Sequence, residues 1–137
     1  MRPRWGLVGF GEAGRVIGAA LAASGADLAV HDRVLLDPER GPGLAEAVRA
    51  AGAQPVADVA GLADRDVVLS LVTPATALAA AEGFAPAARD GVLYVDLNST
   101  APQVKEAVFA HIAAGTWDRS WVAAALTEVR VGPEVVA

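Results

Sequence analysis

The sequence of 137 residues has no cysteine, two histidines and a single lysine. The lack of cysteine excludes disulfides, thiolate catalysis and cysteine-type zinc sites. His31 and His111 are far apart and lack metal-ligand spacing, so we expect no metal site. No apolar run reaches the roughly 18 residues of a transmembrane helix. Gly9, Gly11 and Glu12 also interrupt what would be a signal-peptide core. We therefore expect a cytoplasmic protein that is not associated with a membrane.

Acidic residues outnumber basic ones, 16 to 11, which gives a formal net charge of −5. An acidic chain is a poor candidate for binding nucleic acid or a membrane surface. Hydrophobic residues make up 54% of the sequence, which is ample for a buried core, and the length suits one domain. We expect a single domain over 1–137, in which 121–137 form a tail without a clear element.

Short apolar segments alternate with segments of helical periodicity. Strands are expected at 5–8, 27–31, 66–72 and 92–96, with a short extended stretch at 54–57 and a sixth strand at 121–126. Helices are expected at 12–24, 44–51, 74–82 and 102–114, with helical turns at 59–63 and 84–89 and a loop at 34–43. Strands that are apolar throughout are typical of a parallel sheet covered on both faces. The expected fold is therefore α/β, a Rossmann-type doubly wound parallel sheet with helices on both faces.

A G-x-G-x-x-G motif follows the first predicted strand and opens the first helix, which is the context that dinucleotide binding requires. The motif consists of Gly9, Phe10, Gly11, Glu12, Ala13 and Gly14. Gly9 permits the tight turn, Gly11 lets a pyrophosphate approach the backbone, and Gly14 lets the helix pack against the strand. The free N–H groups of the helix then face the phosphates. The alternative is a glycine-rich turn without a ligand.

Asp32 ends the second predicted strand, close to the separation of about 20 residues at which such folds place a ribose-binding acid. Its carboxylate would accept hydrogen bonds from ribose hydroxyls and repel a 2′-phosphate, which favours NAD. Arg33 beside it offers a guanidinium that would bind that phosphate and so admits NADP. The sequence therefore predicts NAD or NADP, with a mild preference for NAD. The alternative is that both residues belong to a loop surface.

Two further turns follow predicted strands, at the sheet edge where ligands bind in open α/β folds. Val72 and Thr73 lie in the first turn, and Asn98, Ser99 and Thr100 lie in the second. Their hydroxyls and amide are candidates for binding a nicotinamide ribose or a substrate carboxylate. The competing interpretation for both threonines is helix capping, since each precedes a proline that opens a helix.

Two charged residues near these motifs, Glu12 and Lys105, are not expected to act as a catalytic acid or base. Lys105 is expected on the solvent face of its helix. Glu12 is expected to complement the dipole of the first helix. No residue is assigned as catalytic.

Three stretches, 6–15, 66–74 and 94–102, together resemble the β-hydroxyacid dehydrogenase superfamily, which includes 3-hydroxyisobutyrate and 6-phosphogluconate dehydrogenases. The resemblance implies an N-terminal Rossmann-type domain in which the three glycines bind pyrophosphate and Asp32 binds ribose. Thr73 would lie near the nicotinamide half. Ser99 and Thr100 match the family's serine–threonine pair near the substrate, and Asn98 adds one residue to the usual spacing.

The family's glycine-rich helix and catalytic lysine have no counterpart in this sequence, so we expect the helical catalytic domain to be absent. In a complete family member, hydride passes between a small hydroxy acid and the nicotinamide. The alternative is a non-catalytic nucleotide-binding or sensor module, which as a homodimer would cover apolar surface. A methyltransferase with the same glycine turn fits the paired threonine motifs less well.

Overall fold

The computed structural model describes residues 2–116, and these form a five-stranded parallel sheet with the strand order β3-β2-β1-β4-β5. This confirms the predicted α/β Rossmann-type sheet. The strands are β1 (Arg4–Val8), β2 (Asp27–His31), β3 (Gln54–Pro55), β4 (Val67–Ser70) and β5 (Leu93–Asp96). The predicted strand at 121–126 lies outside the described residues.

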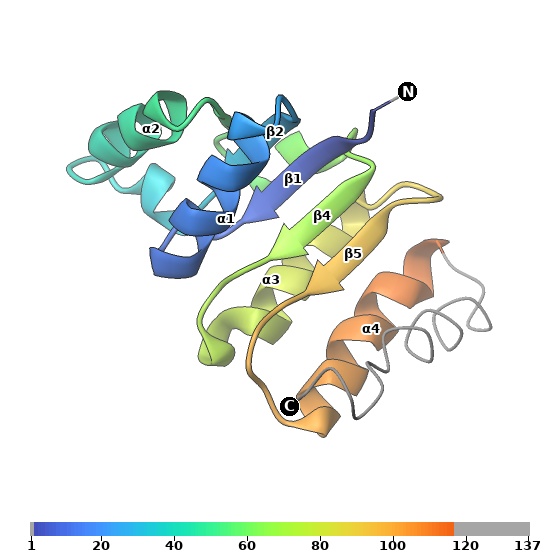
Figure 1. Ribbon diagram of the computed structural model, residues 1–137. Helices are drawn as coiled ribbons and strands as arrows, with labels where there is room; N and C mark the ends of the chain where they lie inside the picture. Colours follow the sequence, from blue (N-terminus) through green and yellow to red (C-terminus); the bar gives the residue numbers. More distant parts are fainter. Residues whose placement is uncertain (1, 117–137) are drawn as a thin grey trace, which may run out of the picture.

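Helices cover both faces of the sheet (Figure 1). They are α1 (Glu12–Ala23), α2 (Gly41–Ala50), α3 (Ala77–Phe84) and α4 (Pro102–Thr116), with 3-10 helices η1 (Arg33–Leu36), η2 (Val59–Leu62), η3 (Pro74–Thr76) and η4 (Ala85–Ala87). Successive residues of β1 point to opposite faces of the sheet and pack in different cores. Leu7 packs in the core of α1 and α2, whereas Val8 packs in the core of α3 and α4. The period-2 geometry of a strand thus builds both cores from apolar strands.

Two predicted segments differ from the structure. The region 34–43 contains η1 and the start of α2, because local carboxylates organise it. Asp32 accepts the N–H of Val34 at 2.8 Å, and Asp37 accepts the N–H of Glu39 at 2.9 Å. The helix expected from Pro74 begins as η3 and becomes α-helical at Ala77. Among residues 2–116, no helix is long and apolar enough to cross a membrane.

The strand register fixes where the functional groups lie. Val8 pairs with His31 on one side and with Ser70 on the other, and Ser70 pairs with Asp96. The carboxyl ends of four strands therefore lie in one row, and the arrows of β1, β4 and β5 in Figure 1 point to the same edge. The turns that leave this row carry the sequence motifs.

Candidate functional site

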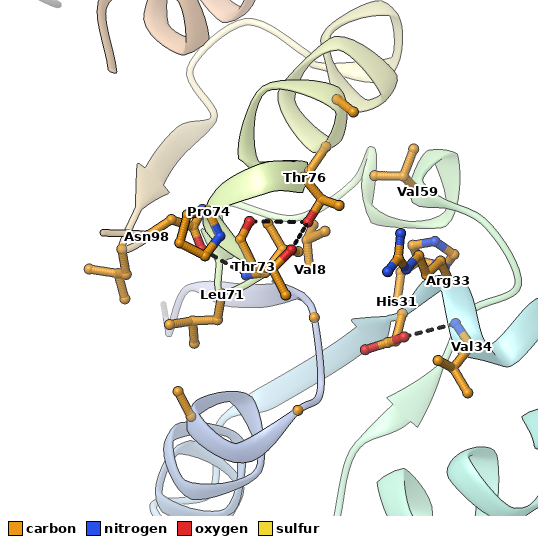
Figure 2. Close-up of a pocket in the computed structure, with 18 of the residues that line it drawn as sticks. Val8, His31, Arg33, Val34, Val59, Leu71, Thr73, Pro74, Thr76 and Asn98 are labelled. Atoms are coloured by element: carbon orange, nitrogen blue, oxygen red, sulfur yellow. Dashed lines mark hydrogen bonds between the residues drawn. The ribbon is translucent and has the colours of Figure 1, made fainter. Parts of the chain in front are cut away.

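A cleft of about 720 Å³ opens at the carboxyl edge of the sheet. Figure 2 shows side chains entering it from two sides, His31 and Arg33 from the end of β2, and Thr73, Pro74 and Asn98 from the turns after β4 and β5. Ten predicted site residues line it: Gly9, Gly11, Glu12, Ala13, Asp32, Arg33, Val72, Thr73, Asn98 and Ser99. The fold thus brings the glycine motif and the two later turns around one space.

The three motif glycines differ in what surrounds them. Gly9 has a φ of +98°, and a Cβ there would lie 2.1 Å from the carbonyl oxygen of Leu71. A Cβ on Gly14 would lie 2.4 Å from the carbonyl oxygen of Gly9. A Cβ on Gly11 would meet nothing within 4 Å. The fold has no space for a side chain at the first and last glycine, whereas at Gly11, the N-cap of α1, the space for a side chain is open and borders the cleft.

The N-terminus of α1 meets the cleft at Gly11, which precedes the helix without a side-chain cap. The first-turn N–H groups of a helix have no partner within the helix. They carry the positive end of the helix dipole, and this turn is therefore suited to an anion. Glu12, which is exposed in this turn, also lines the cleft.

Phe10 shapes the turn from behind, because its side chain is only 3% exposed and packs in the core beside α1. A Cβ on Gly18 would lie 3.0 Å from its ring, and the guanidinium of Arg15 lies 5.4 Å from the ring centroid. Neither Phe10 nor Gly14 lines the cleft. They contribute by holding the turn in place.

Asp32 bridges two backbone segments beside the cleft. Its carboxylate accepts the N–H of Phe10 and the N–H of Val34, each at 2.8 Å. A carboxylate has about four lone-pair sites, so two remain for other donors. Arg33 is exposed and makes no hydrogen bond or ion pair with any of residues 2–116. The end of β2 thus presents one carboxylate and one free guanidinium to the cleft.

Asn98 joins the two turns on the opposite side. Its amide oxygen accepts the N–H of Val72 at 2.7 Å, and its amide nitrogen donates to Ser70 Oγ at 3.0 Å. The residue is only 6% exposed. Its side chain is therefore occupied within the protein, and Ser99 next to it is the exposed residue at the cleft.

The two threonines do not cap helices with their side chains. Thr73 precedes η3, and its hydroxyl lies 2.8 Å from the hydroxyl of Thr76 instead of a free N–H group. The Oγ1 atom of Thr100 is buried and has no hydrogen-bond partner. Thr73 is the N-cap residue of η3, as the capping interpretation expects, but neither threonine makes a capping hydrogen bond with its side chain. Thr73 lines the cleft and Thr100 does not.

The prediction for Lys105 is also wrong. Its side chain is 30% exposed and pairs with Asp96, whose carboxylate is only 1% exposed, with an Nζ to Oδ1 distance of 3.1 Å. The ammonium turns inward because the segment after β5 presents oxygen atoms to it. Sequence periodicity did not reveal this, since a single polar residue carries no information about which carboxylate it faces.

Buried oxygen atoms without partners lie behind this wall of the cleft. They are Tyr94 Oη, Asp96 Oδ2 and Thr100 Oγ1. Burial raises the pKa of the Tyr94 hydroxyl to about 12, so the phenol stays protonated. Its ring stacks on Phe84 with centroids 5.5 Å apart. Tyr94 thus places a hydroxyl in the core of α3 and α4.

Sequence reasoning missed several residues that line the cleft: His31, Val34, Val59, Thr76 and Leu97. His31 is the last residue of β2, and its Nδ1 atom lies 3.1 Å from the carbonyl oxygen of Val56. Its place at the carboxyl end of a predicted strand was a usable signal. Leu97, which is 48% exposed, was detectable as an apolar residue between polar neighbours in the same turn.

No family model and no curated protein matches this sequence, whereas solved structures match its fold. A conserved hypothetical protein from Sinorhizobium meliloti 1021 is 38% identical with a TM-score of 0.82, over 85% of this chain and 39% of that one. A conserved protein of unknown function that is structurally similar to 3-hydroxyacid dehydrogenases is 28% identical with a TM-score of 0.67, over 80% and 39%.

The 3-hydroxyisobutyrate dehydrogenase of Mycobacterium tuberculosis has the same fold, with 21% identity and a TM-score of 0.71, over 85% of this chain and 38% of that one. The chain has the N-terminal fold of the β-hydroxyacid dehydrogenases. The resemblance predicted from the sequence is confirmed at this level. The chain spans about two fifths of the length of each of these structures. The similarity therefore extends over the described sheet and the turns that line the cleft.

Proposed function

We propose that the cleft binds a nicotinamide dinucleotide and that the chain is the cofactor-binding part of an oxidoreductase. The observation that carries this proposal is Gly11. It lies at an uncapped helix N-terminus, it borders the cleft, and nothing lies within 4 Å of the place where its Cβ would be. Glycine also suits the N-cap position of a helix, so what supports a ligand is that the open space beside Gly11 faces the cleft, where a pyrophosphate can approach the backbone.

The proposed cofactor lies across the cleft from the end of β2 to the turns after β4 and β5. The first turn of α1 receives the pyrophosphate, and Asp32 accepts hydrogen bonds from the adenosine ribose. Val72 and Thr73 lie next to the nicotinamide half. Residues 9–14 together form the binding turn, in which Phe10 and Gly14 act by shaping it.

We propose NAD as the preferred cofactor. A 2′-phosphate would meet the negative charge of Asp32, whereas ribose hydroxyls find its two remaining lone-pair sites. Arg33 opposes this preference, because its guanidinium is exposed at the cleft and has no partner among residues 2–116. The balance between these two side chains sets the ratio of the two affinities.

In a complete enzyme the nicotinamide exchanges a hydride with the carbon that bears a hydroxyl group in a small hydroxy acid. Ser99 and Thr100 are proposed on the substrate side. Only Ser99 reaches the cleft as the structure stands, because Thr100 Oγ1 is buried. We propose that Ser99 contacts the substrate and that Asn98 holds the turn.

A second candidate is cofactor binding without turnover by this chain, as expected for a nucleotide-binding or sensor module. One observation favours it. The single lysine of the sequence, Lys105, is held by oxygen atoms of its own chain. It does not line the cleft, so it is unsuited to shuttle a substrate proton.

Calorimetric titration of the 137-residue chain with NADH, and separately with NADPH, tests the proposal. We expect binding of NADH with a dissociation constant in the roughly micromolar range and weaker binding of NADPH. If neither binds, the proposal is wrong. Consumption of NADH with small keto acids by this chain would rule out the second candidate, whereas binding without turnover is expected under both.

A further inference from the structure

Lys105 and Asp96 form a buried ion pair behind the wall of the cleft. The ammonium contacts three oxygen atoms: Asp96 Oδ1 at 3.1 Å, the Asp96 carbonyl at 3.0 Å and the Asn98 carbonyl at 2.5 Å. The ammonium donates hydrogen bonds to the two carbonyls and forms an ion pair with the carboxylate. The Lys105 ammonium thus contacts both Asp96, at the end of β5, and Asn98, in the turn that follows.

This segment is joined directly to the cleft. Asp96 Oδ1 also accepts the backbone N–H of Asn98 at 2.8 Å, so the same carboxylate holds both Lys105 and Asn98. Asn98 in turn holds the N–H of Val72 with its amide oxygen at 2.7 Å. The chain of contacts runs from α4, through the turn after β5, to the turn after β4.

We propose that Lys105 is a positioning residue for the nicotinamide half of the cofactor. By holding Asn98 from α4, it sets the place of Val72 and of the exposed Leu97 and Ser99 at the cleft. Its polar contacts end at the turn after β4, which packs against Gly9, whereas the hydrogen bond that holds the glycine turn comes from Asp32 on the other side. This inference rests on the proposed function, since it assumes that a dinucleotide occupies the cleft.

A comparison of two ligands, ADP-ribose and NADH, distinguishes this role from a general effect on folding. ADP-ribose contains the adenosine and pyrophosphate groups and lacks nicotinamide, so it reports on the glycine turn and Asp32 alone. NADH reports on both sides. The unaltered chain is expected to bind NADH more tightly than ADP-ribose, and the ratio of the two dissociation constants measures the contribution of the side that Lys105 holds.

The test uses two variants of the full chain. Lys105→Met removes the ammonium and leaves the Asp96 carboxylate buried without its partner, which destabilises a fold. The double variant Asp96→Asn, Lys105→Met removes both charges and keeps an oxygen for the N–H of Asn98. Glu106→Gln is the matched control, because Glu106 is the exposed neighbour on α4.

In the double variant we expect NADH affinity to fall by about tenfold, equivalent to about 1.4 kcal/mol, while ADP-ribose affinity stays within about twofold. The control should keep both affinities. Equal losses for both ligands, or no loss for NADH, overturn the inference. Equal binding of the two ligands by the unaltered chain also overturns it. If the unaltered chain binds neither NADH nor ADP-ribose, the proposed function itself fails and this inference falls with it.

Discussion

The Asp32 carboxylate accepts the backbone N–H of Phe10 at 2.8 Å, and this bond ties the end of β2 to the glycine turn. The same carboxylate also begins η1 through the N–H of Val34. Asp32 therefore has a structural role in addition to the ribose contact proposed for it. The two roles are separable, because one is measured by stability and the other by ligand preference.

Asp32→Asn is expected to lower the stability of the chain and to change its cofactor preference. The amide keeps one neutral acceptor oxygen, so one of the two backbone N–H groups loses its acceptor and the other loses a charged partner. We expect the free energy of unfolding to fall by about 1.5–3 kcal/mol in denaturant titrations. The affinity for NADH should fall more than that for NADPH, because the charge that repels a 2′-phosphate is gone.

Arg33→Gln is the complementary change. Arg33 is exposed and has no partner among residues 2–116, so its removal should leave the free energy of unfolding within about 0.5 kcal/mol of the original value. NADPH affinity should fall while NADH affinity is kept. If NADH and NADPH affinities respond identically to both substitutions, Asp32 and Arg33 do not govern the choice of cofactor.

Gly11→Ala should mainly weaken ligand binding, whereas Gly14→Ala should mainly lower the stability of the fold. The added methyl at Gly11 meets nothing within 4 Å, so the loss of stability should be limited to the cost of alanine at an N-cap, up to about 1 kcal/mol. NADH and ADP-ribose affinity should both fall by about tenfold or more, because the methyl occupies the space for the pyrophosphate. Titration calorimetry measures this loss.

At Gly14 the added Cβ lies 2.4 Å from the carbonyl oxygen of Gly9, so the backbone must move. We expect a loss of about 1–3 kcal/mol in the free energy of unfolding. This variant is the control for Gly11→Ala. Undiminished NADH binding by a folded Gly11→Ala chain would contradict the pyrophosphate assignment.

The sheet and the glycine turn could be predicted from the sequence because their signals are local. Apolar β-branched runs mark the strands, and a motif of fixed spacing marks the turn. The Rossmann-type fold and the resemblance to β-hydroxyacid dehydrogenases are accordingly confirmed. Boundaries were less accurate where side chains bond to nearby backbone, as at Asp37, which helps to start α2 earlier than hydrophobic periodicity indicates.

The partners of individual polar side chains could not be predicted, because they depend on the register between strands. Asp96 and Ser70 are paired across β4 and β5, and this pairing brings Asn98 beside Val72. Lys105 was expected at the solvent face since its own helix gives no sign of the carboxylate that it meets. Contacts between distant segments follow from the assembled sheet and not from any local pattern.

Stability should fall in acid because of carboxylates at the amino ends of the strands. The N–H of Arg4, with its guanidinium and that of Arg89, holds the pKa of Asp66 below its usual value. The side chain of Arg65 does the same for Asp64. A carboxyl group with a lowered pKa stabilises the fold above its unfolded pKa, and this contribution is lost as the pH falls through the folded value.

Denaturant titrations between neutral pH and about pH 3 measure this loss, which we expect to begin below about pH 5. Asp66→Asn should lower stability at neutral pH and flatten the acid dependence. An unchanged slope in this variant would show that Asp66 is not one of the groups responsible. Glu106→Gln, at an exposed position on α4, is the control for loss of a carboxylate.

Tyr94→Phe is expected to leave the stability unchanged or to increase it. The Tyr94 hydroxyl is buried and lacks a well-formed hydrogen bond, since the nearby Ser70 side chain already accepts from Asn98, so the fold bears part of the cost of removing the hydroxyl from water. Phenylalanine keeps the ring that stacks on Phe84 and removes that cost. We expect the free energy of unfolding to stay the same or to rise by up to about 1–3 kcal/mol. A loss above about 1 kcal/mol would instead mean that the hydroxyl is hydrogen-bonded, either to the Ser70 side chain or to a buried water molecule.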